Sequence, residues 1–402
     1  MILDDICEFI VDCPHSTAED EGAGYPLIRT PNIGRGQLIL DGVHRVSKKV
    51  YEERTKRGQP QKGDLILARE APAGNVALLR TDEKVCLGQR TVLIRPNTNY
   101  VNPVWLTYYL LSPKQQWRLL GDANGATVAH VNLPVIRNLD VTVPPLEKQN
   151  CIAEFIVNYD NFVENNNKQI ALLEEAAQRL YVEWFVKFHF PGHENVQVVD
   201  GVPEGWEKTP AADIFSLIRG KSYTSAELCQ DSDTLLINLK NIRAWGGYKR
   251  GEEKNYCGDI NKEQTVTTGD IVMAVTDMTA ERRLVGHFAL IPKLDRTSII
   301  SMDLVKVVSK GMNNYFLYSL LRYSGIERLF SAYANGTNVL HLNPELILNE
   351  KLLVPERFLI NKYASIVTPI YQKIDILNDT IKLLQEARDR LLPKLMNGEI
   401  EV

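Results

Sequence analysis

The sequence predicts a mixed α/β (α+β) protein in which two similar halves each carry one globular domain followed by one long helix. Residues 124–132 and 335–343 match at an offset of 211 (335 − 124), and the same offset relates residues 170–176 to 381–387. Within each half the pattern changes once, from short strand-like runs to a continuous helical periodicity. A fixed offset between similar segments indicates a duplicated architecture.

The offset drifts in the earlier part of each half. It is 209 between Asn32 and Asn241 (241 − 32) and 206 between Gly63 and Gly269 (269 − 63). Drift of a few residues indicates changes of loop length within a shared fold. We therefore expect one half at about 1–190 and the other at about 200–402, with the first part of each half more diverged than the second.

Composition limits the classes of protein that this chain can belong to. The 402 residues suggest two or three domains, and 44% hydrophobic with 24% charged residues is ordinary globular usage. A net charge of −4 excludes a polycation that coats nucleic acid by charge alone. The six cysteines form no CxxC pair, and neither a signal peptide nor a membrane-spanning run is recognisable. We expect a reduced, cytoplasmic chain with no disulfide framework, no metal site and no membrane association.

Each globular region is expected to combine strands with one helical stretch. Apolar runs at 64–68, 92–94, 271–275 and 304–308 are typical of strands. The helical stretches are expected at 103–120 and 313–330. The side chains expected to face inward from them are Trp105, Tyr108, Tyr109, Leu111, Phe316, Leu317, Leu320 and Leu321.

Long helices are predicted at 145–190 and 356–402. Apolar positions alternate in steps of four and three, which predicts a coiled-coil seam. The seam residues are Ile152, Ile156, Tyr159, Val163, Ile170, Leu173, Leu180, Tyr363, Val367, Ile370, Ile374, Leu377, Ile381, Leu384 and Leu391. Asn166 is a polar exception that either fixes the register or lies in a frayed, solvent-facing turn. The shared seam favours an antiparallel pair related by a two-fold axis, and a helix of about 40 residues is about 60 Å long.

Several motifs also resemble a known family. Residues 144–149 (Pro-Pro-Leu-Glu-Lys-Gln) and 152–154 (Ile-Ala-Glu) look like the end of a target recognition domain entering a conserved helix. Residues 219–225 and their counterpart 12–17 are similar to a domain-opening motif, and residues 388–400 are a typical ending. Together these segments resemble the specificity (S) subunit of type I restriction-modification enzymes. The second helix entry, Val-Pro-Glu-Arg-Phe-Leu-Ile, departs from the pattern.

The resemblance implies target recognition domains at 1–144 and 200–355, each reading one half of a split double-stranded DNA site. It implies that the helices set the spacing and dock two methyltransferase subunits, with two restriction and translocase subunits joining the full complex. S-adenosylmethionine, ATP and Mg²⁺ would belong to those partners. This chain is therefore expected to hold no cofactor and to be non-catalytic.

Side chains that offer paired donors and acceptors are the candidates for reading bases. In the first half they are Arg29, Asn32, Arg35, Arg69, Arg90 and Thr127; in the second they are Asn238, Lys240, Asn241, Arg243, Lys249, Arg250 and Asn338. The shared pairs His130/His341 and Asn132/Asn343 are better explained as turn formers, because domains that read different bases should differ at readout positions.

Alternative functions remain open at this point. A coiled-coil scaffold whose globular domains bind proteins would have the same architecture. A self-sufficient nuclease or methyltransferase is less favoured, because no cofactor fingerprint appears and Phe215 stands where a phosphate-binding loop ending at Gly220-Lys221-Ser222 needs its first glycine. Trp184, Phe185 and Phe188, at the end of the first long helix, form either a partner surface or a cap on the adjacent domain.

Overall fold

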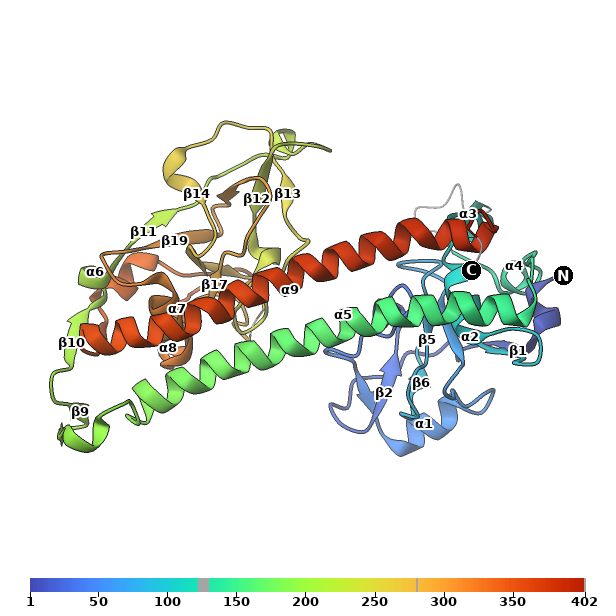
Figure 1. The fold of residues 1–402 in the computed structure, drawn as a ribbon, viewed down its shortest axis with the longest axis horizontal. Helices are drawn as coiled ribbons and strands as arrows, with labels where there is room; N and C mark the ends of the chain where they lie inside the picture. The colour runs from blue at the N-terminus through green and yellow to red at the C-terminus, as the bar shows by residue number, and fades with distance from the viewer. Residues whose placement is uncertain (122–129, 280, 401–402) are drawn as a thin grey trace. The chain divides into compact units, whose positions relative to one another are not determined.

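The computed structural model describes residues 1–121, 130–279 and 281–400 (Figure 1). These residues divide into two compact units. The first unit joins Met1–Asn165 to Ile381–Val402, and the second is Asn166–Thr380. Each unit contains one globular domain together with a segment of both long helices, so the boundary between the units crosses the helices and does not follow the ends of the domains.

The first domain is built on a four-stranded antiparallel sheet. Its order is β1 (Cys7–Asp12), β7 (Thr91–Pro96), β4 (Leu65–Ala68) and β5 (Val76–Leu78). A smaller sheet has the order β3 (Arg45–Val46), β2 (Tyr25–Ile28) and β6 (Cys86–Leu87), with β2 parallel to β6. The short helices are α1 (Lys48–Arg54) and α4 (Leu133–Arg137).

The second domain repeats this topology. Its main sheet has the order β11 (Phe215–Arg219), β19 (Leu304–Ser309), β15 (Ile271–Ala274) and β17 (Phe288–Leu290). Its second sheet has the order β13 (Lys254–Asn255), β12 (Thr234–Ile237), β18 (Thr297–Ile300) and β14 (Thr265–Val266), with β12 parallel to β18. In both domains the first strand pairs with the last and an inner hairpin completes the sheet. The predicted duplication is confirmed.

Additional short elements frame the second domain. These are β8 (Val198–Val199), β9 (Val202–Pro203), β10 (Glu207–Pro210), α6 (Ala211–Ile214), β16 (Thr276–Asp277), β20 (Leu340–His341), η9 (Pro344–Asn349) and β21 (Lys351–Val354). β10 pairs with β21, and β16 pairs with β20. The β16–β20 pair joins the loop between β15 and β17 to the segment that precedes η9.

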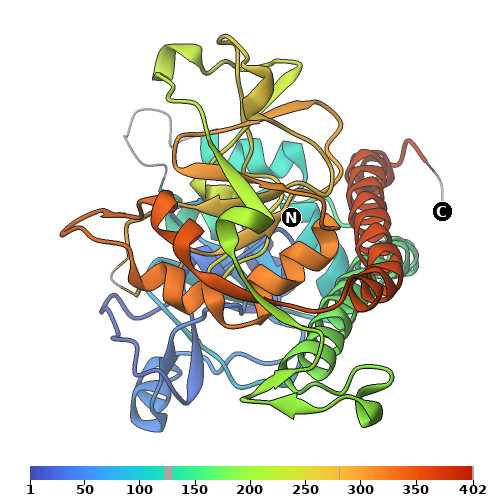
Figure 2. The same cartoon turned by 90° about the vertical axis from the view of Figure 1, so that its left-hand side faces the viewer.

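Each main sheet is buried on both faces, because alternate residues of a strand point to opposite sides. In the second domain Ile271 and Met273 pack against the helices α7 (Asn314–Tyr323) and α8 (Ile326–Ala332). Val272 and Ala274 point to the other face and pack against the second sheet. Figure 2 shows these helices, in orange, beside the strands of the domain. In the first domain Leu65 and Ile66 likewise point to opposite faces of the sheet and belong to different core clusters.

The two predicted helical stretches are each divided into two helices, which corrects the expectation of one continuous stretch. In the first domain α2 (Pro103–Leu110) ends before α3 (Pro113–Leu120), where Pro113 cannot continue the hydrogen-bonding of the preceding turn. In the second, α7 (Asn314–Tyr323) and α8 (Ile326–Ala332) are separated by Gly325, whose φ of 91° is left-handed. All the side chains predicted to face inward are buried.

The long helices are α5 (Leu146–Tyr181), which continues through one π turn at Val182–Val186, and α9 (Arg357–Asn397). α9 runs through Pro369 at an exposed position. In the first unit the beginning of α5 shares a core with the end of α9, through Ile156 and Leu392. In the second unit the end of α5 shares a core with the beginning of α9, through Tyr181 and Tyr363. The predicted antiparallel pairing is confirmed.

The predicted seam positions all turn inward: each of them is buried or half-buried. Tyr363 is fully buried, and its hydroxyl lies 3.1 Å from the carbonyl oxygen of Ala177 and 3.0 Å from the Ser319 hydroxyl. This tyrosine therefore joins α9 to α5 and to α7 of the same unit. Asn166 is half-buried.

A buried carboxylate joins the first domain to both helices of its unit. Asp160 on α5 accepts a hydrogen bond from the Tyr108 hydroxyl at 2.5 Å and from the Arg388 guanidinium of α9 at 2.7 Å. It also forms an ion pair with Arg80. The Arg388 guanidinium lies 5.6 Å from the centre of the Tyr108 ring. Burial, aided by the neighbouring Asp160, raises the pKa of Tyr108 well above its usual value, so its hydroxyl stays a donor.

One disulfide corrects the expectation of a fully reduced chain. Cys229 and Cys257 are bonded, whereas Cys7, Cys13, Cys86 and Cys151 are free. An antiparallel bridge between Leu228 and Tyr256 brings the two segments together, and the Cα atoms of the two cysteines lie 6.2 Å apart. The 28-residue separation conceals the disulfide in the sequence. No described helix combines the length and apolar character needed to cross a membrane.

Replacing Asp160 with alanine is expected to lower the free energy of unfolding by about 3 kcal/mol, because the Arg388 charge would remain buried without its partner. Urea unfolding followed by circular dichroism measures this change. The matched control is Asp389→Ala, since Asp389 is exposed and contacts the same arginine. A loss of stability no larger for Asp160→Ala than for Asp389→Ala would contradict the prediction.

Candidate nucleic-acid interface

Two predicted readout residues hold equivalent turns. Asn32 ends the 3-10 helix η2 (Thr30–Asn32), and Asn241 ends η7 (Leu239–Asn241). The Asn32 amide accepts from the Arg29 backbone N–H and donates to the Ile39 carbonyl, at 3.1 and 3.0 Å. The Asn241 amide makes the corresponding bonds within its own turn. Both are buried, so the structure places them in the scaffold of the turn.

Asn238 has the same scaffold role. Its side-chain oxygen accepts from the Lys240 backbone N–H at 3.0 Å, and its amide nitrogen donates to the Glu252 carbonyl at 3.0 Å. The exposed cations of this turn are Lys240, within η7, and Arg243, which follows it. The sequence predicts these asparagines as base-reading residues because residue type alone does not reveal which hydrogen bonds a side chain already makes within the fold.

The first domain has a polar hollow of about 370 Å³ beside β4. It is lined by His15, Arg69, Glu70, Gln89, Arg90 and His130. Arg69 is buried, and it donates to the Val131 carbonyl at 2.8 Å and contacts His130 at 2.8 Å. Glu70 bridges His130 and Arg90. Arg90 is exposed and has a left-handed φ of 64°, so it is the cation of this group that faces solvent.

The other candidates of the first half lie in different settings. Arg35 is exposed and donates one bond to the Leu111 carbonyl at 3.1 Å. Arg29 is half-buried, and its Nε is buried with no partner among the described residues. Thr127 lies outside the described residues. Arg35 and Arg90 are therefore the arginines best placed to meet a ligand in this half.

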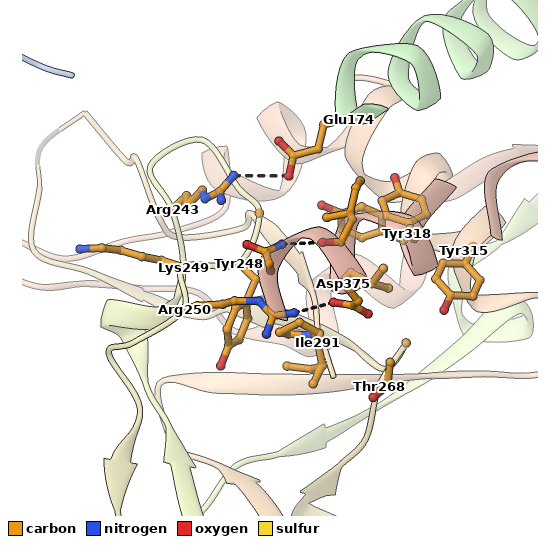
Figure 3. Close-up of a pocket in the computed structure, with 17 residues that line it drawn as sticks. Glu174, Arg243, Tyr248, Lys249, Arg250, Thr268, Ile291, Tyr315, Tyr318 and Asp375 are labelled. Atoms are coloured by element: carbon orange, nitrogen blue, oxygen red, sulfur yellow. Dashed lines mark hydrogen bonds and ion pairs between the residues drawn. The ribbon is translucent and has the colours of Figure 1, made fainter. Parts of the chain in front are cut away.

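The second unit has a pocket of about 280 Å³ between its domain and its segments of the long helices (Figure 3). Arg250 pairs with Asp375 of α9 at 2.5 Å, and Arg243 pairs with Glu174 of α5 at 3.4 Å. Lys249 extends away from the pocket in Figure 3 and pairs with Glu252 at 2.9 Å. Burial raises the pKa of the Asp375 carboxyl, although Arg250 opposes this shift. The pairs made by Arg250 and Arg243 fix the domain to its segments of the two long helices.

The loop between β15 and β17 is longer than its counterpart in the first domain. From Ala274 to Phe288 is 14 residues (288 − 274), whereas from Ala68 to Val76 is 8 (76 − 68). A large part of the offset drift therefore arises in this loop. A hairpin loop can change length in this way without disturbing the sheet.

Comparison with known proteins agrees with this geometry. Residues 1–175 match the family model described as the type I restriction modification DNA specificity domain. The chain is 25% identical over 393 residues to the type I restriction enzyme MjaIX specificity subunit of Methanocaldococcus jannaschii, covering 95% of this chain and 88% of that protein. It is 24% identical over 404 residues to the HindI specificity subunit of Haemophilus influenzae, covering 85% and 87%. Residues 1–175 thus carry the type I restriction modification DNA specificity domain, and along most of its length the chain resembles specificity subunits of type I restriction enzymes.

A solved structure has the same fold. The S subunit of a type I restriction-modification system from M. genitalium superposes with a TM-score of 0.53 at 15% identity, covering 98% of this chain and 95% of that chain. The family resemblance inferred from the helix-entry and ending motifs is confirmed. Within the described ranges 1–121, 130–279 and 281–400, no three His, Cys, Asp or Glu side chains are grouped as a metal site requires.

The shared asparagines stand at the starts of short helices, whereas the shared histidines have other settings: His130 lines the polar hollow and His341 lies in a strand. His341 belongs to β20, and Asn343 accepts the Glu345 backbone N–H at 3.2 Å at the start of η9. Asn132 occupies the position before α4. Trp184 and Phe185 are buried in the core of the second unit, which supports the capping alternative over a partner surface. Asn338 remains exposed.

Asp277, which the sequence did not single out, joins the two ends of the loop between β15 and β17. This fully buried carboxylate accepts from the backbone N–H groups of Thr279 and Leu284, at 2.7 and 2.6 Å, and from the Thr279 hydroxyl at 2.8 Å. Burial alone would raise its pKa, but these hydrogen bonds lower it below the usual 3.8. An aspartate between two strand-like runs gives no sequence signal for this role.

Asp277→Asn is expected to lower the free energy of unfolding by about 1–3 kcal/mol at pH 7, because buried N–H donors lose a charged acceptor. Since the folded pKa is lowered, the stabilisation by Asp277 is present above about pH 4 and is lost as the pH falls through the folded value. Urea unfolding from pH 3 to 7 should therefore show a difference that shrinks on acidification. Exposed Asp213→Asn is the control, and parallel curves for Asp277→Asn and wild type would contradict the prediction.

Proposed function

We propose that this chain is the DNA-sequence specificity subunit of a type I restriction-modification complex, in which each recognition domain reads one half of a split site. The observation that carries the proposal is a duplicated scaffold with different exposed side chains. Asn32 and Asn241 build the same turn, yet the turn presents Arg35 in one half and Lys240 with Arg243 in the other. Two readers of different bases need such an arrangement.

The exposed cations supply phosphate and base contacts in this proposal. Arg35, Arg90, Lys240 and Lys249 are exposed, although Arg90 and Lys249 each pair with a glutamate; Arg69 is buried and Arg250 half-buried, and both are engaged within the chain. A net charge of −4 gives the whole chain little general attraction for DNA. The chain alone is therefore expected to bind weakly, with partner subunits completing the DNA clamp.

The long helices serve as the spacer in this proposal. α5 has 36 residues and α9 has 41, which correspond to about 54 and 62 Å at 1.5 Å per residue. One turn of B-DNA is about 34 Å. Half-sites one to two turns apart would match such helices, and a rigid seam would keep that distance constant.

The helices also offer equivalent partner surfaces. Leu172 on α5 and Leu383 on α9 are related by the repeat offset of 211 (383 − 172), and their exposed fractions are 64% and 65%. An exposed leucine on each helix at the same repeat position suits two copies of one partner. We propose that two methyltransferase subunits dock there, and that catalysis, S-adenosylmethionine, ATP and Mg²⁺ belong to the partner subunits.

The specificity role is tested by sequencing methylated adenines in a host with and without this chain, co-expressed with the host's methyltransferase subunits. The expected result is one chain-dependent motif of two short half-sites around a fixed gap. A folded complex without chain-dependent methylation would contradict the proposal and favour a protein-binding scaffold. Activity of the purified chain alone would contradict a non-catalytic role.

Docking is tested by Leu172→Asp and Leu383→Asp, which place a charge in an apolar contact. Each single variant is expected to lose about one of two methyltransferase subunits, and the double variant both, by native mass spectrometry of the purified complex. Gln178→Asp on α5 is the matched control, since Gln178 is exposed on another side of the helix. Unchanged subunit ratios in the double variant would refute this docking surface.

A further inference from the structure

We propose that Trp245 is a base-contacting residue that determines specificity in the second recognition domain. The inference rests on the proposed function and extends it to one residue. An exposed tryptophan at the tip of a rigid turn can stack on bases or insert between two base pairs. The ligand is double-stranded DNA, and the contact is made by the indole ring.

The position of Trp245 is unusual for so large an apolar residue. Its exposed fraction is 54%, and its φ is 64°. Gly246 and Gly247, which follow it, also have left-handed φ values of 92° and 94°. A bulky residue rarely adopts this backbone region, and such positions occur often at binding sites. The turn therefore presents the indole at the surface through a conformation that the surrounding structure must impose.

That surrounding structure is well defined. The Trp245 backbone N–H donates to the Arg283 carbonyl at 2.7 Å, and Gly247 donates to the Phe288 carbonyl at 2.8 Å. Ile242 and Tyr248 form a bridge that closes the base of the turn. The turn is thus held against both the loop between β15 and β17, through Arg283, and strand β17 itself, through Phe288.

A buried charged cluster supports the turn from below. Glu327 contacts Arg322 at 2.7 Å and His287 at 3.1 Å, and it accepts the Phe288 backbone N–H at 2.9 Å. A Cβ at Gly246 would lie 2.7 Å from the Arg322 Cζ, and the left-handed φ of 92° is strained for other residues, so glycine suits this position. The indole meets His287 edge-on at 5.7 Å, which orients the ring while leaving more than half of it exposed.

The charge around Trp245 complements a polyanion. Residues 239–249 and 281–287 contain five Lys or Arg residues and one acidic residue, Glu281, in a chain whose net charge is −4. Glu174 of α5 also approaches this group through Arg243. Phosphate contacts from such cations position a protein on DNA, whereas an apolar ring contributes to the choice of bases.

The first domain carries a different side chain in the corresponding turn. There Ile33 and Leu38 form the closing bridge, and Gly36 donates to the Val76 carbonyl at 2.8 Å as Gly247 does to Phe288. Arg35 and Gln37 are the exposed side chains of that shorter turn. The turn of the second half therefore presents a tryptophan, whereas residues 33–38 of the first half contain no aromatic side chain, and two readers of different half-sites require such a difference.

The experiment compares complexes containing wild type, Trp245→Phe, Trp245→Ala and Trp117→Ala, each with the methyltransferase subunits. Trp117 is the control because it is 74% exposed and belongs to the first domain. Trp245→Ala is expected to weaken binding to the cognate site roughly tenfold or more. The methylation motif of the Trp245→Ala complex should accept additional bases in one half-site only. Trp245→Phe should retain binding to within a few-fold, and Trp117→Ala should keep the affected half-site unchanged.

Tryptophan fluorescence adds a readout that a structural role would not change. Cognate DNA should quench the wild-type complex more than the Trp245→Phe complex, with equal thermal midpoints for the two proteins. Unchanged motif and affinity in Trp245→Ala, or equal relaxation of both half-sites, would overturn the inference. If the wild-type complex itself shows no chain-dependent methylation, the proposed function fails and this inference fails with it.

Discussion

The core of each compact unit is completed by a helix end that comes from the other half of the sequence. In the first unit Leu392 and Leu395 of α9 enter a core built by residues of the first domain. In the second, Ala177 and Tyr181 of α5 enter the core around β15 and α7. Burial of these side chains stabilises each domain through the hydrophobic effect. The antiparallel pairing of α5 and α9 is therefore a condition for both domains, beyond its role as a spacer.

Charged contacts then orient each domain on its helices. Asp160 joins Arg80 of the first domain to Arg388 of α9, and in the second unit Arg250 joins Asp375. Ion pairs removed from water add little net stability, but they are costly to break one partner at a time and so favour a single geometry. A protein that reads two separated half-sites needs such a defined orientation, because a misplaced reader loses its base contacts.

Site residues were harder to predict than the fold, because residue type alone does not tell whether a polar side chain builds the scaffold or faces solvent. Asn32, Asn238 and Asn241 have the amides that read bases, but their hydrogen bonds are used to build turns. The sequence does not mark Trp245 as a contact residue, because tryptophan side chains are highly buried on average. Its exposure depends on a left-handed turn that is held in place in part by contacts distant in sequence, from Arg283 and Phe288.

Local periodicity and internal similarity determined the duplicated α/β domains, the two long helices and their seam, since these features depend on residue spacing alone. The family followed from short motifs at the helix entry and the chain end. Tertiary structure decided what depends on contacts between distant residues. It paired Cys229 with Cys257, engaged Arg69 and Arg250 within the chain while leaving Arg35 and Lys240 exposed, and placed Asp277 beneath the long loop. Hydrogen bonds and ion pairs between segments far apart in the chain have no periodic trace in the sequence.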